Sequence, residues 1–239
     1  MVWEIVTELG GLYFFLLVIG LLVWTGQRKR SIGLSGVLLL DSLLIGGLKN
    51  FFAVQRPAGA TEPSYSFPSA HTSRISALLS FLREEPWYYS LALLVAISRV
   101  AMGEHFWQDV VAGLLIGAVE GYVVFSLWKR FPEYKVEKRY RWYLLGGVLA
   151  LTIFALYISP GFMYSEYSGS LLGLGLGYLT EVKTPRGFDR KRVGIGVAGF
   201  LVIAYLAYGT GGTYGFLSHY LLGLWVSFGC EKLDSFIKF

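Results

Sequence analysis

The sequence has little charge, almost no asparagine and a single cysteine. Charged residues make up 15% of its 239 positions, well below the quarter that is typical of soluble domains. Because Cys230 is the only cysteine, an internal disulfide is excluded and a catalytic thiol has little support. Asn50 is the only asparagine, a depletion found in proteins from hot habitats, although a membrane composition also accounts for it. With 54% hydrophobic residues, the chain has the composition of an integral membrane protein.

Apolar runs recur along the whole chain and predict an all-α fold, a polytopic transmembrane helical bundle of about nine spans. A helix that crosses a bilayer needs about 20 apolar residues, so the third and seventh runs are short. The runs cover residues 10–26, 31–50, 69–82, 87–102, 106–128, 142–158, 167–180, 193–209 and 215–230.

The cations are unevenly shared between the two faces that nine crossings would create. One face receives 17 of the 21 lysines and arginines, including the run 28–30 after the first span. By the positive-inside rule that face is cytoplasmic. We therefore expect a multi-pass cell-membrane protein with its N-terminus outside and its C-terminus in the cytoplasm. The other, outer face receives the remaining four cations, which are Lys49, Arg56, Arg74 and Arg99.

The chain divides near residue 130. We expect residues 1–130 to form a membrane-embedded core and residues 131–239 to add further transmembrane helices to the same membrane unit. In the second part, the segment 171–174 and Glu181 recur fifty residues later as 221–224 and Glu231. Small residues allow membrane helices to approach closely, so this repeat indicates helix packing rather than a second site.

Three polar patches interrupt the apolar first part, and all three belong to the outer face. Ionisable groups inside a membrane are costly, so such a cluster indicates a functional site. Asp109 is the only carboxylate that we assign to it. The patches are Lys49 with Arg56-Pro57, then Pro68-Ser69-Ala70-His71, then Ser98-Arg99 with His105 and Asp109.

These residue types suit phosphoryl transfer through a histidine. His105 and Asp109 are four residues apart and therefore lie on one helix face, where the carboxylate can fix the imidazole tautomer. One ring nitrogen of His105 is then left as the nucleophile, and His71 is the candidate for proton donation to the leaving oxygen. The candidate phosphate ligands are Lys49, Arg56, Ser69 and Arg99, with backbone N–H groups at the start of the third span.

The spacing resembles the three-part signature KxxxxxxRP, PSGH and SRxxxxxHxxxD of the type-2 phosphatidic acid phosphatase superfamily, whose relatives include vanadium haloperoxidases and glucose-6-phosphatase. The resemblance covers Lys49 to Asp109 directly. It implies a phosphohistidine on His105, Asp109 as its orienting partner, His71 as general acid, and phosphate binding by the cations. It also implies that no metal cofactor is needed.

One position departs from the signature, because Ala70 stands where the family has glycine. If the backbone there must adopt a positive φ, alanine costs about 1 kcal/mol. We expect an adjusted site rather than an inactive one, with the backbone of Ala70 still next to the phosphate.

The sequence therefore predicts an integral membrane phosphatase of a lipid phosphate or diphosphate. An isoprenoid diphosphate is the first candidate substrate, and nucleic acid is not an expected partner. A phosphatase of a soluble sugar phosphate, a lipid phosphotransferase and, in another class, an anion transporter are the alternatives. The sequence does not indicate the oligomeric state.

Two further charges lie below the site. Asp41 precedes Lys49 by eight residues and Arg74 follows Ser69 by five, so the two side chains sit at similar depth on consecutive helices. We expect them to form a buried ion pair that braces the second and third spans, the alternative being a protonated Asp41 and an Arg74 that reaches the interface.

Overall fold

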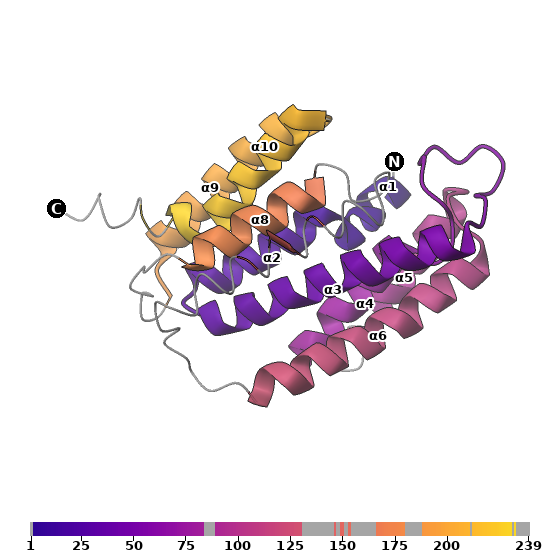
Figure 1. Cartoon of the computed structure of the whole chain (residues 1–239), viewed down its shortest axis with the longest axis horizontal. Coiled ribbons are helices and arrows are strands. Elements are labelled where there is room, and N and C mark those ends of the chain that lie inside the picture. Colours follow the sequence, from indigo (N-terminus) through magenta and orange to yellow (C-terminus); the bar gives the residue numbers. More distant parts are fainter. Residues whose placement is uncertain are drawn as a thin grey trace. The chain divides into compact units, whose positions relative to one another are not determined.

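The computed structural model describes residues 2–83, 89–130, 166–179, 188–210 and 212–230, with the single positions 146, 149, 150, 153 and 232. Every regular element in these ranges is helical (Figure 1). In chain order they are α1 Val2–Thr7, the 3-10 turn η1 Glu8–Gly10, α2 Leu12–Trp24, α3 Arg28–Phe52, α4 Ala70–Leu82, α5 Tyr89–Ala101, α6 Trp107–Arg130, α8 Glu166–Leu179, α9 Arg190–Ala207, α10 Gly212–Leu224 and the π-helical turn η3 Trp225–Gly229.

The predicted apolar runs other than 142–158 are each helical, with boundaries shifted by a few residues. The run 142–158 lies almost wholly outside the described residues. Among those described, α3 and α6 are long and apolar enough to cross a membrane, judged by length and composition. A third span results if α2 is counted together with the bent segment Val2–Gly10 before it, across a bend of 53°. A helical fold with two or three candidate membrane spans is thus confirmed for the described residues, while nine spans stay a prediction.

The chain divides into two compact units. Unit 1 comprises residues 1–15 and 36–132, and unit 2 comprises residues 16–35 and 133–239. The helix α3 therefore contributes its first turns to unit 2 and the rest to unit 1. Whether the two parts of the chain act as one membrane unit, with a boundary near residue 130, stays a prediction.

In unit 1, α4 is buried along nearly its whole length and packs closely on α6. Glycines recur every fourth residue along α6, on the side of this helix that contacts the backbone of α4. A Cβ on Gly117 would lie 2.0 Å from the carbonyl oxygen of Ser73, and one on Gly121 would lie 2.2 Å from that of Ala77. Serine side chains of α4 also form hydrogen bonds to the backbone of α6: Ser76 Oγ donates to the carbonyl of Leu114 at 2.8 Å. This close packing fixes the start of α6 against the start of α4.

In unit 2, α8 and α10 meet in the same way. A Cβ on Gly173 would lie 2.2 Å from the carbonyl oxygen of Tyr220, and one on Gly223 would lie 2.3 Å from that of Ser170. These glycines are the corresponding members of the fifty-residue repeat. The interpretation of that repeat as a helix-packing element is confirmed.

Candidate active site

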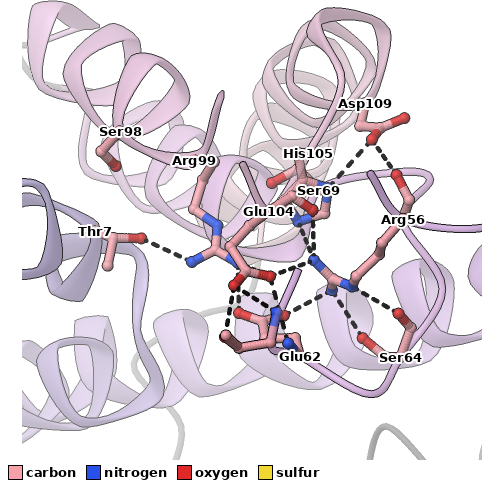
Figure 2. A network of polar contacts seen from close by, with 12 residues as sticks. Thr7, Arg56, Glu62, Ser64, Ser69, Ser98, Arg99, Glu104, His105 and Asp109 are labelled. Carbon is pink, nitrogen blue, oxygen red and sulfur yellow. Dashed lines mark hydrogen bonds and ion pairs between the residues drawn. The ribbon is translucent and has the colours of Figure 1, made fainter. Parts of the chain in front are cut away.

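Residues of all three polar patches lie close together in unit 1, among them Arg56, Ser69, Arg99, His105 and Asp109 (Figure 2). Three parts of the chain meet there: the loop 53–69 between α3 and α4, the first turn of α4, and the short link between α5 and α6. The helix α3 ends where Ala53 adopts a left-handed φ of 49°, with its N–H donating to the carbonyl of Lys49 at 2.9 Å. The chain then leaves the helix and carries Arg56 toward the link that holds His105.

His105 and Asp109 face each other as their spacing predicts. His105 Nδ1 lies 3.3 Å from Asp109 Oδ2, and both side chains are almost fully buried. The same oxygen accepts a hydrogen bond from the N–H of Phe106 at 2.9 Å and one from the hydroxyl of Ser66. Asp109 is therefore held from three sides and orients the imidazole ring.

The second ring nitrogen of His105 faces a guanidinium. Arg56 Nη1 lies 3.2 Å from His105 Nε2. Burial, together with the charges of Arg56 and Lys49, lowers the pKa of His105 to about 4, against the opposing effect of its hydrogen bond to Asp109. At neutral pH the ring is uncharged, so Nδ1–H donates to Asp109 and Nε2 keeps its lone pair.

Two carboxylates complete the site between the arginines (Figure 2). Glu62 Oε2 lies 2.6 Å from Arg56 Nη2, and Glu62 Oε1 pairs with Arg99 Nη2. Glu104 Oε2 lies 3.3 Å from Arg56 Nη1 and 3.9 Å from Arg99 Nη2. Burial raises the pKa of Glu62, but Arg99 and Arg56 outweigh this effect and leave it below its usual value. Both arginines are thus neutralised within the site.

Lys49 and Arg56 also organise the loop. Lys49 Nζ donates to the carbonyl of Ser66 at 3.1 Å and to that of Tyr65, while Arg56 Nε donates to the carbonyl of Ser64 at 2.6 Å. Lys49 is only 1% exposed. The two residues predicted as phosphate ligands therefore also shape the segment that borders the site.

Ser69, Ala70 and His71 open α4 beside this network. The N–H of Ser69 donates to the carbonyl of Asp109 at 3.0 Å, and its hydroxyl lies 3.0 Å from that of Thr72. Ala70 is the first residue of the helix and is not among the residues with positive φ, so alanine in place of glycine carries no left-handed strain. His71 is half-buried, and its ring makes no hydrogen bond to a described residue.

The residues matched by a known family coincide with this site. The PAP2 superfamily model matches residues 30–133, which span α3 to α6 and include every residue of the three patches. This similarity to the PAP2 superfamily covers less than half of the 239 residues, and the three patches lie within the matched part. The resemblance inferred from the three-part signature is thereby confirmed.

Two relatives of the chain have names that describe phosphatases of lipids. A lipid A 1-phosphatase of Porphyromonas gingivalis is 31% identical over 56% of this chain and 35% of its own length. An undecaprenyl-diphosphatase of Sulfolobus acidocaldarius is 29% identical over 47% of this chain and 63% of its own length. The chain thus spans between about a third and two-thirds of the length of these relatives. No solved structure matches it.

Two carboxylates that the sequence did not point to, Glu62 and Glu104, also contact the arginines of this site. Glu104 directly precedes His105 and therefore had a positional signal. Glu62 had none, because its place depends on the path of the irregular loop 53–69. The same holds for Ser66. Thr7, at the end of α1, also had no signal in the sequence, and its hydroxyl accepts a hydrogen bond from Arg99 Nη1 at 3.2 Å.

The described residues contain no candidate metal site. Within the described ranges, no three His, Cys, Asp or Glu side chains are grouped so that they would hold a metal ion. Glu62 and Glu104 instead pair with arginines, and Asp109 pairs with His105. Independence from metals stays a prediction.

Proposed function

We propose that the chain is an integral membrane phosphatase that hydrolyses a lipid phosphate or diphosphate through a phosphohistidine on His105. The observation that carries the proposal is the orientation of the His105 ring, with Nδ1 on Asp109 and Nε2 facing Arg56. This arrangement keeps a neutral nitrogen lone pair beside the guanidinium of Arg56, where a phosphoryl group could meet both a nucleophile and a positive charge.

In the first step, Nε2 attacks phosphorus, a P–N bond forms and the bond from phosphorus to the leaving oxygen breaks. His71 donates a proton to that oxygen. The leaving group is then the lipid alcohol or, when the substrate is a diphosphate, the lipid monophosphate. Asp109 stabilises the positive charge that develops on the imidazole. In the second step, water attacks phosphorus while His71 accepts its proton, and the P–N bond breaks to release inorganic phosphate.

Arg56, Arg99 and Lys49 supply the charge that the transition state needs. Phosphoryl transfer spreads negative charge over three equatorial oxygens, and preorganised cations stabilise it strongly in a dry site. Arg99 is buried, and its guanidinium converges with that of Arg56 on the same carboxylate. The first-turn N–H groups of α4, including those of Ala70 and His71, add the favourable end of a helix dipole.

Exposed aromatic side chains beside the site support a lipid substrate. Phe51 and Phe52 end α3 two and three residues after Lys49, and they are 80% and 49% exposed. Phe106 and Trp107 follow His105 directly and are 43% and 60% exposed. Apolar side chains at these positions suit an acyl or prenyl chain next to the phosphate. The names of the relatives support the same substrate class, with an isoprenoid diphosphate as the first candidate.

We also propose that the site opens on the extracytoplasmic side, with the N-terminus outside and the C-terminus in the cytoplasm. The unequal distribution of lysine and arginine supports this orientation. The loop 53–69 and the link between α5 and α6 then belong to the outer face.

The test is phosphate release by the purified protein in detergent. The panel contains a polyprenyl diphosphate, lipid A, phosphatidic acid and glucose 6-phosphate, which represents the soluble alternative. We expect turnover of at least one lipid substrate in EDTA and inhibition by orthovanadate. Release from glucose 6-phosphate alone, or from no member of the panel, contradicts the proposal.

A further inference from the structure

Glu62 occupies the place between the two arginines where a phosphate would bind. Its two carboxylate oxygens divide between them, Oε2 to Arg56 at 2.6 Å and Oε1 to Arg99 (Figure 2). Arg56 lies in the loop after α3 and Arg99 in the last turn of α5, so one carboxylate joins two distant parts of the chain. Two oxygens of a phosphoryl group present the same bidentate partner to such a pair.

The second carboxylate, Glu104, is held differently. Its Oε1 accepts hydrogen bonds from the N–H and hydroxyl of Thr61, at 3.0 and 2.6 Å, and its Oε2 accepts one from the N–H of Glu62 at 3.4 Å. Its side chain is 4% exposed. Glu104 is therefore an internal anchor that ties the loop backbone to the link between α5 and α6.

The side chain of Glu62, by contrast, is held only by its ion pairs with the two arginines. The side chain is 32% exposed, and its carboxylate pairs with Arg56 and Arg99 and with no other residue in the described part of the chain. A change of side-chain rotamer therefore suffices to withdraw it toward solvent, while the hydrogen bond from its N–H to Glu104 keeps the backbone in place. The loop need not unfold for the two arginines to become available.

Withdrawal of the Glu62 side chain would change the net charge of the site. Arg56 and Arg99 contribute two positive charges, and Glu62 and Glu104, which pair with them, contribute two negative charges. In the free site the two carboxylates therefore balance the two arginines, which lowers the cost of holding buried guanidinium groups next to a neutral His105. Withdrawal of Glu62 leaves an excess positive charge, which favours a phosphate dianion over a singly charged carboxylate.

We propose that Glu62 is an internal competitor that fills the phosphate position in the free enzyme and is displaced by the phosphoryl group of the substrate. The inference rests on the proposed function for the identity of the displacing anion. Its consequence is that Glu62 sets the affinity and the charge selectivity of the site and takes no part in the chemical step.

The test compares wild type with Glu62→Gln and Glu62→Asp, with Glu166→Gln as the control. Glutamine keeps the size of the side chain but removes the charge, and aspartate is one methylene shorter and cannot span both arginines. Glu166 is an exposed carboxylate at the start of α8, in unit 2, and its substitution removes the same charge outside the site. The measurements are the inhibition constants of orthovanadate and inorganic phosphate, and KM and kcat for the lipid substrate.

We expect Glu62→Gln to lower both inhibition constants and KM by at least about five-fold, with kcat within about two-fold of wild type. The aspartate variant should change in the same direction, and the Glu166 control should not change. Inhibition constants that stay the same or rise, or a kcat that falls while KM holds, would overturn the inference, because Glu62 would then position the arginines.

Phosphate binding is also measured without turnover, as the rise in melting temperature that added inorganic phosphate produces. A larger rise in Glu62→Gln than in wild type supports displacement even if no substrate in the panel is hydrolysed. An equal or smaller rise contradicts displacement even if hydrolysis is found. Failure of this inference and failure of the proposed function are thus separate results.

Discussion

The side chains of Asp41 and Arg74 form an ion pair inside unit 1, with Arg74 Nε 3.5 Å from Asp41 Oδ2. Each is 1% exposed, and each has a second partner. Asp41 Oδ1 accepts a hydrogen bond from the hydroxyl of Ser73 at 2.6 Å, and Arg74 Nη1 donates to the carbonyl of Gly10 at 2.6 Å. The pair thus joins α3, α4 and the turn η1 below the site, and the pairing predicted from the depths of the two residues is confirmed.

We predict that this pair contributes to stability through mutual interaction. Breaking a buried pair by removing one partner costs on the order of 3 kcal/mol, because the other charge is left uncompensated. Asp41→Asn and Arg74→Gln should each lower the melting temperature in detergent, and the double variant should lose less than the two losses combined. The coupling energy should exceed about 1 kcal/mol. Strict additivity would show that the two charges are independent.

The uncharged state of the His105 ring should affect the pH dependence of stability. The pKa of this histidine is about 4 in the folded protein, below the ~6.5 of an unfolded histidine. Between these values the unfolded chain binds more protons, so the stability that is fully present above pH ~6.5 is lost as the pH falls toward about 4. The loss is on the order of 3 kcal/mol. Melting curves from pH 7 to 4 should fall less steeply for His105→Ala than for wild type, and equal slopes would contradict the assignment.

The contact between α4 and α6 should tolerate no side chain at Gly117. The Cβ of alanine there would lie 2.0 Å from a backbone oxygen of Ser73, so one of the helices must shift, at a cost of about 1–3 kcal/mol. Because α6 carries Asp109 in its first turn, we expect Gly117→Ala to lower both the melting temperature and the turnover. The matched control is Gly47→Ala in α3, where a Cβ meets nothing within 4 Å. Unchanged behaviour of Gly117→Ala would show that the helices are less closely packed.

The orientation in the membrane is testable with engineered cysteines. Ala58 is exposed in the loop of the site, Arg30 is exposed near the start of α3, and the only native cysteine, Cys230, is fully buried. In a Cys230→Ser background, a membrane-impermeant maleimide should label Ala58→Cys in intact cells and Arg30→Cys only after permeabilisation. The reverse pattern would place the site on the cytoplasmic side.

The features that depend on the regular spacing of residues along a helix could be predicted from the sequence. The helix ends lie within a few residues of the predicted runs, and the facing of His105 and Asp109 follows from a spacing of four residues. The pair of Asp41 and Arg74 follows from the rise per residue along two consecutive helices. In each case, the regular geometry of the helix fixes where a side chain lies along the helix axis.

The irregular loop could not be predicted in the same way. Glu62 reaches the arginines only because the chain turns back between residues 53 and 69, and no period in the sequence encodes that path. The doubt about Ala70 arose from a possible positive φ, and the structure removes it because this residue already belongs to α4. The short helix at Val2–Thr7 was also not predicted.

The central claim is that His105 Nε2 becomes phosphorylated during turnover. The most direct measurement is rapid acid-free quenching of wild type with a substrate whose transferred phosphate is radiolabelled, followed by mapping of the labelled peptide. The account predicts a label on His105 that is stable in alkali and lost in acid, reduced in Asp109→Asn and absent in His105→Ala, which should also lose turnover while keeping its fold. A label on another residue, or near wild-type phosphate release by His105→Ala, would contradict it.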